Sequence, residues 1–208
     1  MGKNSTLDFY NQNAEKYFEQ TVHGEMQESY DRFMMFLPEG AYILDFGCGS
    51  GRDSKYFLSQ GYSVKAIDGS EKLAELASKY IGQPVETMDF SELSDVLTYD
   101  GIWACSSILH VERESLPDIL RKMITALKED GVIYTCFKKG DKCEMQDGKY
   151  YNYMTKELLE KMLAEIEPEA KIVEYYESTT YKNVNRPTAT WGNYLIKRDR
   201  GTVWTREN

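Results

Sequence analysis

A glycine-rich turn follows the first apolar run of the chain and carries its densest group of chemically informative residues. The segment reads Ile43-Leu44-Asp45-Phe46-Gly47-Cys48-Gly49-Ser50-Gly51-Arg52-Asp53, a strand-like stretch, a turn and the start of a helix-like stretch. Glycine lets the backbone approach a ligand closely and adopt turn conformations closed to other residues. The helix N-terminus beyond it offers unpaired N–H donors. We therefore expect Gly47, Cys48 and Gly49 to contact a ligand.

Two further acids end the next strand-like runs and extend this prediction. Asp68 lies about 20 residues after Gly47, where an acid can hold both ribose hydroxyls of a nucleoside. Asp89 ends the third run, where it can accept the adenine amino group while Met88 or Phe90 covers the ring. Gly69 and Ser70 follow Asp68 directly and join the predicted binding residues.

The ligand is either a dinucleotide or S-adenosylmethionine, and two residues favour the second. Arg52 stands where a tight dinucleotide-binding unit favours a third glycine. Asp45 would repel a pyrophosphate, whereas it suits a ligand with an ammonium group and a sulfonium. We therefore predict S-adenosylmethionine as cofactor, with S-adenosylhomocysteine as product.

Residues after the fourth run are candidates for the reacting end of the site. Cys105 and Ser106 are predicted cofactor contacts, and His110 is the candidate catalytic residue, as an acceptor-orienting group or a base. His110 as a capping or packing residue is the alternative. A tyrosine cluster follows in an expected loop, where its rings either steady a sulfonium or pack as a lid: Tyr150, Tyr151 and Tyr153. The histidines and acids form no metal-ligand cluster, so no metal is expected.

Apolar β-branched and aromatic runs alternate with amphipathic stretches, a pattern typical of a parallel α/β sheet. The strands are expected at Tyr42–Phe46, Ser63–Ile67, Val85–Met88, Gly101–Cys105, Val132–Phe137, Ile172–Tyr176 and Tyr194–Lys197. The helices are expected at Leu7–Glu19, Met26–Phe36, Asp53–Gln60, Glu71–Tyr80, Ser115–Leu127 and Thr155–Ile166. We expect one domain, with a helical cap over 1–37, an α/β core over 41–198 and a polar tail over 199–208.

The composition of the chain indicates which classes of binding partner to expect. The 208 residues carry a formal net charge of −9, whereas nucleic-acid affinity comes largely from basic patches. The four cysteines show no Cys-x-x-Cys pair, and neither a signal-peptide pattern nor an apolar run of about 18 residues occurs. We therefore expect a cytoplasmic protein that acts on a small molecule, without a nucleic-acid or membrane partner; a protein acceptor is the alternative. The composition predicts no oligomeric state.

These motifs together resemble the class I S-adenosylmethionine-dependent methyltransferases. Asp45 to Gly51 looks like the glycine-rich motif of that family, Asp68 like its ribose-binding acid and Asp89 like its adenine-binding acid. The fourth and fifth strands also match, in Tyr99-Asp100-Gly101-Ile102-Trp103-Ala104-Cys105 and Leu127-Lys128-Glu129-Asp130-Gly131-Val132-Ile133. The resemblance implies a Rossmann-like, doubly wound, seven-stranded mixed sheet whose last strands are antiparallel.

A finer resemblance is to the small-molecule branch that includes tellurite-resistance-type methyltransferases. It is carried by Tyr10-Asn11-Gln12-Asn13-Ala14-Glu15-Lys16-Tyr17, Gly51-Arg52-Asp53-Ser54 and Cys105-Ser106-Ser107-Ile108-Leu109-His110-Val111. It implies that Tyr10, Tyr17 and Arg52 enclose the methionine end of the methyl donor. The predicted activity is metal-free, in-line transfer of a methyl group to a small-molecule acceptor. A non-catalytic S-adenosylmethionine-binding module and an NAD-dependent oxidoreductase remain the alternatives.

Overall fold

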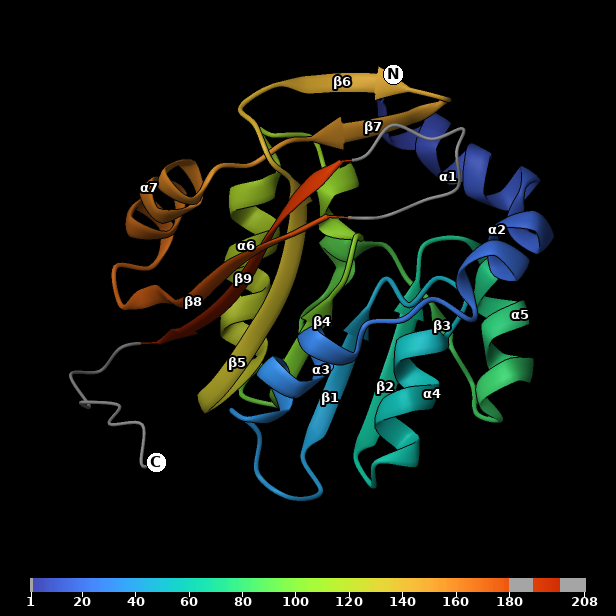
Figure 1. The fold of residues 1–208 in the computed structure, drawn as a ribbon, viewed down its shortest axis with the longest axis horizontal. Coiled ribbons are helices and arrows are strands. Elements are labelled where there is room, and N and C mark those ends of the chain that lie inside the picture. The colour runs from blue at the N-terminus through green and yellow to red at the C-terminus, as the bar shows by residue number, and fades with distance from the viewer. Residues whose placement is uncertain (1, 180–188, 199–208) are drawn as a thin grey trace.

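The computed structural model describes residues 2–179 and 189–198, and the expected polar tail at 199–208 lies outside them (Figure 1). Within these ranges, no helix has both the length and the apolar character needed to cross a membrane.

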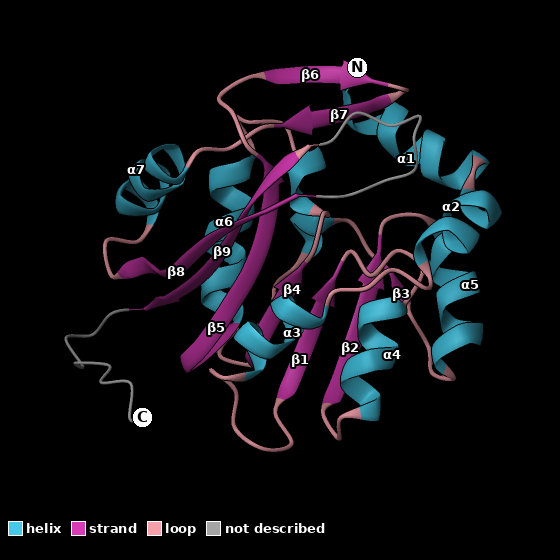
Figure 2. Cartoon of the chain, viewed as in Figure 1, coloured by secondary structure: helices cyan, strands magenta, loops and turns pink. Residues whose placement is uncertain are grey.

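A seven-stranded mixed sheet forms the centre of the fold, as predicted. Its strand order is β3-β2-β1-β4-β5-β9-β8, in which β1 to β5 run parallel and β9 is antiparallel to both β5 and β8 (Figure 2). The strands are β1 (Tyr42–Phe46), β2 (Ser63–Asp68), β3 (Glu86–Thr87), β4 (Tyr99–Ala104), β5 (Leu127–Lys138), β8 (Ala170–Thr179) and β9 (Thr190–Arg198).

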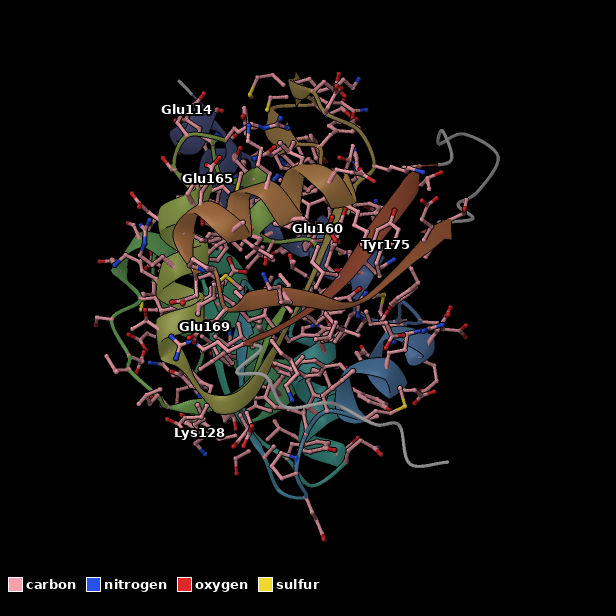
Figure 3. All side chains as sticks on the ribbon, turned by 90° about the vertical axis from the view of Figure 1, so that its left-hand side faces the viewer. Glu114, Lys128, Glu160, Glu165, Glu169 and Tyr175 are labelled. Carbon is pink, nitrogen blue, oxygen red and sulfur yellow. The ribbon has the colours of Figure 1, made fainter. Side chains whose placement is uncertain are left out.

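Helices cover both faces of this sheet because successive strand residues point to opposite sides. Ile43 packs in one buried cluster with residues of α3 (Gln27–Met34), α4 (Arg52–Ser59) and α5 (Glu71–Ile81). The adjacent Leu44 packs in the other cluster, with residues of α6 (Leu116–Ala126) and α7 (Lys156–Ile166). Figure 3 shows α7 beside β8, on which Tyr175 is labelled. Two short 3₁₀ helices, η1 (Phe90–Glu92) and η2 (Ile108–His110), follow β3 and β4.

The chain begins with two helices in place of the single one predicted over Leu7–Glu19. They are α1 (Gly2–Gln12) and α2 (Ala14–Thr21), separated at Asn13. The Asn13 side chain donates a 2.8 Å hydrogen bond to the carbonyl of Phe9. Asparagine competes in this way for backbone groups and so disfavours helix continuation. The break turns α2 away from α1, and both helices lie along the carboxyl edge of the sheet (Figure 1).

A β-hairpin lies where the sequence indicated a loop. Strands β6 (Cys143–Gln146) and β7 (Lys149–Asn152) form a separate two-stranded sheet beside α1 (Figure 1). Asp147 and Gly148 at the turn have φ angles of 52° and 78°, and two positive φ values in an Asp-Gly pair are typical of a tight hairpin turn. Tyr150 and Tyr151 are therefore strand residues, and Tyr150 N donates to Thr6 Oγ1 of α1 at 3.0 Å.

Candidate active site

A cavity of about 1730 Å³ opens at the carboxyl ends of the parallel strands. Its walls come from the turns after β1, β2 and β4, the end of β5, helices α1 and α2, and the β6–β7 hairpin. In open α/β sheets, ligands bind in this crevice, where the strand order reverses. The cavity is therefore the candidate active site.

The floor of the cavity is the glycine turn after β1. Gly47 has a φ of 88°, and a Cβ atom there would lie 2.5 Å from Cβ of Ser107. Gly49 has a φ of 56°, and a Cβ atom there would lie 3.2 Å from the Tyr17 ring. Gly47 therefore requires glycine for backbone conformation and for space, and Gly49 favours it for backbone conformation. Gly47, Cys48 and Gly49 all line the cavity, as predicted.

Asp68, at the end of β2, points into the cavity from beside this turn. Its two carboxylate oxygens accept hydrogen bonds from the backbone N–H groups of Gly49 and Ser70, each at 2.8 Å. Burial raises the pKa of Asp68, while the two hydrogen bonds act in the opposite direction. Each carboxylate oxygen can accept a further hydrogen bond. Asp68 is thus fixed in direction and able to receive a pair of ligand hydroxyls.

The residues after β3 form one wall of the cavity. Met88, Asp89 and Phe90 all line it, and the Phe90 ring lies 4.5 Å from the Phe46 ring, centroid to centroid. Asp89 also caps η1, since its side chain accepts the N–H of Ser91 at 2.9 Å. Gly69 lies at the same wall, where Leu7 of α1 approaches it. An aromatic face and an acceptor oxygen therefore stand together at this wall.

Two predicted binding residues do not line the cavity. Asp45 is 1% exposed and accepts a 2.6 Å hydrogen bond from Ser54 Oγ, beneath the glycine turn. Burial, followed by the charge of Asp53, raises the pKa of Asp45 to about 8. Ser70 is fully buried and caps α5, with its hydroxyl accepting the N–H of Leu73 at 3.3 Å. Asp45 and Ser70 were predicted as ligand contacts, but their side chains are instead committed to the hydrogen bond with Ser54 and to capping α5.

Asp53, which the sequence analysis did not single out, anchors the Arg52 side of the cavity. Its carboxylate accepts hydrogen bonds from Arg52 Nε at 2.6 Å, from Trp103 Nε1 at 2.8 Å and from the hydroxyl of Tyr30. Burial opposes ionisation of Asp53, but the Arg52 charge and these hydrogen bonds outweigh it, so its pKa is lowered. Arg52 lines the cavity and is held there by Asp53. The sequence did offer one signal for Asp53, namely that it is an acid in the first turn of a predicted helix.

His110 lies at the cavity wall with both ring nitrogens engaged. Nδ1 lies 2.6 Å from the carbonyl of Tyr150, and Nε2 lies 2.8 Å from the hydroxyl of Tyr10. Because a carbonyl only accepts, Nδ1 carries the proton and Nε2 accepts from Tyr10. Burial lowers the pKa of His110 to about 4, so the ring is neutral at pH 7.

The strand ends of β4 and β5 bring two thiols together. Cys105 and Ser106 line the cavity as predicted, and so does Cys136, which the sequence analysis did not single out. Cys136 Sγ accepts the Ser106 N–H at 3.2 Å. A hydrogen bond from Cys105, followed by those from Ser106, lowers the pKa of Cys136 to about 7.

Among the described residues, the buried Ser107 Oγ lines the cavity without a hydrogen-bond partner.

Comparison with known proteins places this architecture in a family. The family model described as a methyltransferase domain matches residues 18–184. A malonyl-[acyl-carrier protein] O-methyltransferase from Enterobacter lignolyticus is 28% identical over 120 residues, which cover 53% of this chain and 45% of that protein. The chain thus spans less than half the length of the curated relatives it matches, from 28% to 45%.

Solved structures show the same fold at low sequence identity. A 1,6-didemethyltoxoflavin-N1-methyltransferase from Burkholderia thailandensis, solved with bound 1,6-didemethyltoxoflavin and S-adenosylhomocysteine, has a TM-score of 0.71 and 21% identity, with 93% of this chain and 85% of that chain covered. TehB from Haemophilus influenzae has a TM-score of 0.67 and 19% identity, with 89% and 67% covered. The fold is that of class I methyltransferases, and the chain belongs to the methyltransferase-domain family.

Proposed function

We propose that this protein transfers a methyl group from S-adenosylmethionine to a small-molecule acceptor. The observation that carries the proposal is Asp68, whose carboxylate is held by the Gly49 and Ser70 N–H groups beside a turn that requires glycine. This arrangement, in a chain of the methyltransferase family, suits the ribose of a nucleoside-containing donor.

The residues of the cavity fit this donor at each of its parts. Asp68 would receive the ribose hydroxyls, and Asp89 and Phe90 would bind the edge and face of the adenine. Arg52 would attract the methionine carboxylate, with Tyr17 and the Cys105–Ser106 segment enclosing the same end. The buried Ser107 hydroxyl offers a further unsatisfied hydrogen-bonding group. When bound, S-adenosylmethionine supplies a methyl group on a sulfonium, which is already an activated leaving group.

The contribution of the chain is then to align the two reactants and to exclude water. Tyr10 from α1 and Tyr17 from α2 both line the cavity, with ring centroids 5.1 Å apart. A hydrogen bond to His110 fixes Tyr10 against the segment after β4, and Thr6 accepts a hydrogen bond from the backbone of β7. We therefore assign residues 1–37 the role of a cap that closes over the donor, on the core formed by residues 41–198.

His110 takes a positioning role in this proposal. Its Nδ1–H is committed to Tyr150, and its Nε2 faces the Tyr10 hydroxyl, so an acceptor reaches the imidazole only through Tyr10. The low pKa of His110 also makes the neutral ring a weak base. His110 therefore orients Tyr10, and the Tyr10 oxygen is the group available to a bound acceptor.

The experiment that tests this proposal is isothermal titration calorimetry with S-adenosylmethionine, S-adenosylhomocysteine and NAD. Micromolar binding of the first two, without binding of NAD, supports the proposed donor. Binding of NAD alone supports the oxidoreductase alternative and overturns the proposal. Once donor binding is established, methyl transfer to any acceptor distinguishes an enzyme from a non-catalytic binding module. We also infer a cytoplasmic location, because all four cysteines are free thiols, as is usual in a reducing compartment.

A further inference from the structure

The charges that line the cavity differ between its two ends. The end near β2 and β3 carries the carboxylates of Asp68 and Asp89. The end formed by β5 and the hairpin carries three lysines, Lys138, Lys139 and Lys149, in a chain whose net charge is −9. The hairpin also contributes the carboxylates of Glu144 and Asp147, and Glu112, after η2, lines the cavity as well. A cationic donor suits the first end, and an anion suits the second.

The carboxylate of Glu144 is already engaged. It accepts from Lys142 Nζ at 2.7 Å and from the Tyr153 hydroxyl at 2.6 Å. Lys139 is engaged as well, because its Nζ lies 2.7 Å from Glu177. Lys138 is not paired in this way. In residues 2–179 and 189–198, no carboxylate lies within ion-pair distance of its Nζ. The Nζ donates instead to the neutral Gln146 Oε1 at 2.9 Å.

Aromatic rings hold the ammonium of Lys138 in place. Its Nζ lies 3.7 Å from the centroid of the Tyr151 ring and 5.5 Å from that of Tyr153, within the range of cation–π attraction. Burial lowers the pKa of Lys138 from its ordinary value, because the charged form loses hydration. A partly desolvated ammonium with donors to spare binds an anionic oxygen by a charge-assisted hydrogen bond.

The same end of the cavity has room and flat walls. Its volume of about 1730 Å³ exceeds the range of about 300–1,000 Å³ that is typical of one small-molecule site, so a second molecule fits beside the donor. The rings of Tyr151, Tyr153 and Trp191 line this part of the cavity. The Tyr151 ring contacts both Lys138 and His110, and its centroid lies 5.0 Å from that of the imidazole.

We propose that the methyl acceptor is a planar aromatic compound with an acidic group, which binds the ammonium of Lys138. Its ring lies against Tyr151, and its nucleophilic atom points toward the Cys105–Ser106 segment and the donor. This inference rests on the proposed function, because it assigns the second ligand of the same cavity. Lys138 is its specificity-determining residue, since it contacts the acid group and not the reacting atoms.

The test compares matched acids and amides on protein saturated with S-adenosylhomocysteine. The probe pairs are 4-hydroxybenzoate with 4-hydroxybenzamide, and indole-3-acetate with indole-3-acetamide, with dissociation constants measured by ligand-observed NMR. Each pair keeps the ring and changes only the charge. We expect the wild-type protein to bind the acid of at least one pair about tenfold more tightly than its amide.

Two variants identify the residue responsible. Lys138→Met keeps a long side chain against Tyr151 but removes the charge, and should reduce the acid-to-amide preference to about one. Lys139→Met is the matched control, because that ammonium is committed to Glu177, and should keep the preference. An unchanged affinity for S-adenosylhomocysteine and an unchanged unfolding midpoint show that Lys138→Met is folded with its donor site intact.

The outcomes separate this inference from the proposed function. If S-adenosylhomocysteine binds but the acids bind no better than the amides, or no aromatic acid binds at millimolar concentration, the acceptor inference is wrong and the donor proposal stands. If the acid preference survives Lys138→Met, Lys138 is not the anion-binding group. If neither S-adenosylmethionine nor S-adenosylhomocysteine binds, the proposed function itself is wrong.

Discussion

The hydroxyl of Tyr10 on α1 lies 2.8 Å from Nε2 of His110, a residue 100 positions later in the chain. This hydrogen bond ties the first helix to the segment that follows β4, across the mouth of the cavity. The backbone carbonyl of Tyr150 fixes the other side of the imidazole, so three distant segments meet at one ring. The cap, the sheet edge and the hairpin are therefore joined at His110.

The neutral state of His110 predicts a pH dependence of stability. Its pKa in the folded protein is about 4, below the ordinary value of 6.5, so the unfolded chain binds more protons between these values. Stability should therefore fall as the pH decreases from about 6.5 toward 4, by about 1–2 kcal/mol between pH 7 and pH 5 from this residue. Urea unfolding of the wild type and of His110→Gln measures the difference, and an equal loss in both proteins would contradict the assignment.

Asp68→Ala should weaken the binding of S-adenosylhomocysteine by about 1–3 kcal/mol, because the ribose hydroxyls lose their acceptor. The matched control is Asp100→Asn. Asp100 is also at a strand of the sheet, but its carboxylate accepts from Tyr42 N at 2.8 Å and pairs with Lys128, and it does not line the cavity. Calorimetry of both variants, each with an unfolding curve, checks the prediction. Unchanged affinity in a folded Asp68→Ala protein would show that the ribose lies elsewhere.

Gly47→Ala should abolish measurable donor binding and lower stability by about 1–3 kcal/mol. The added Cβ would meet Ser107 Cβ at 2.5 Å in a backbone conformation with a φ of 88°. Gly40→Ala separates the two causes, because Gly40 has a φ of 67° with no atom within 4 Å of the added Cβ. The control should lose stability from backbone strain alone and keep its donor affinity. If Gly40→Ala also loses donor affinity, backbone strain and not the contact with Ser107 explains the loss of binding in Gly47→Ala.

Cys136 should react with iodoacetamide with a midpoint near pH 7, because its thiolate is stabilised by hydrogen bonds from Cys105 and Ser106. Peptide mass spectrometry resolves this labelling from that of the exposed Cys143. Cys105→Ala removes the largest stabilising contribution and should move the Cys136 midpoint to higher pH. Saturation with S-adenosylhomocysteine should slow the reaction, since Cys136 lines the cavity. A midpoint for Cys136 that is the same in both proteins would exclude the hydrogen bond as the cause.

Local signals made the strands of the sheet and the glycine-turn side of the cavity predictable. The strand over Tyr42–Phe46 was predicted with the bounds that the structure gives, because a short apolar run followed by a glycine turn is informative without distant contacts. Asp68 was predicted for the same reason, since it ends a strand next to a turn that needs glycine. Asp45 shows the limit of this approach: the sequence gives its position in the motif, but only packing determines that its carboxylate points to Ser54.

The hairpin and the acceptor side depended on tertiary contacts. The Asp147-Gly148 pair was a local signal for the hairpin turn, but the flanking segments are too polar to read as strands. Nothing near Lys138 in the sequence indicates that its ammonium would lie between two tyrosine rings from β7 and the residue after it. The sequence by itself determined the α/β class, the parallel strands and the glycine turn that lines the cavity, because hydrophobic period and glycine placement act over a few residues. Only the tertiary structure decided which charges face the cavity, because that depends on contacts between distant segments, such as Thr6 and Tyr150, which are 144 positions apart.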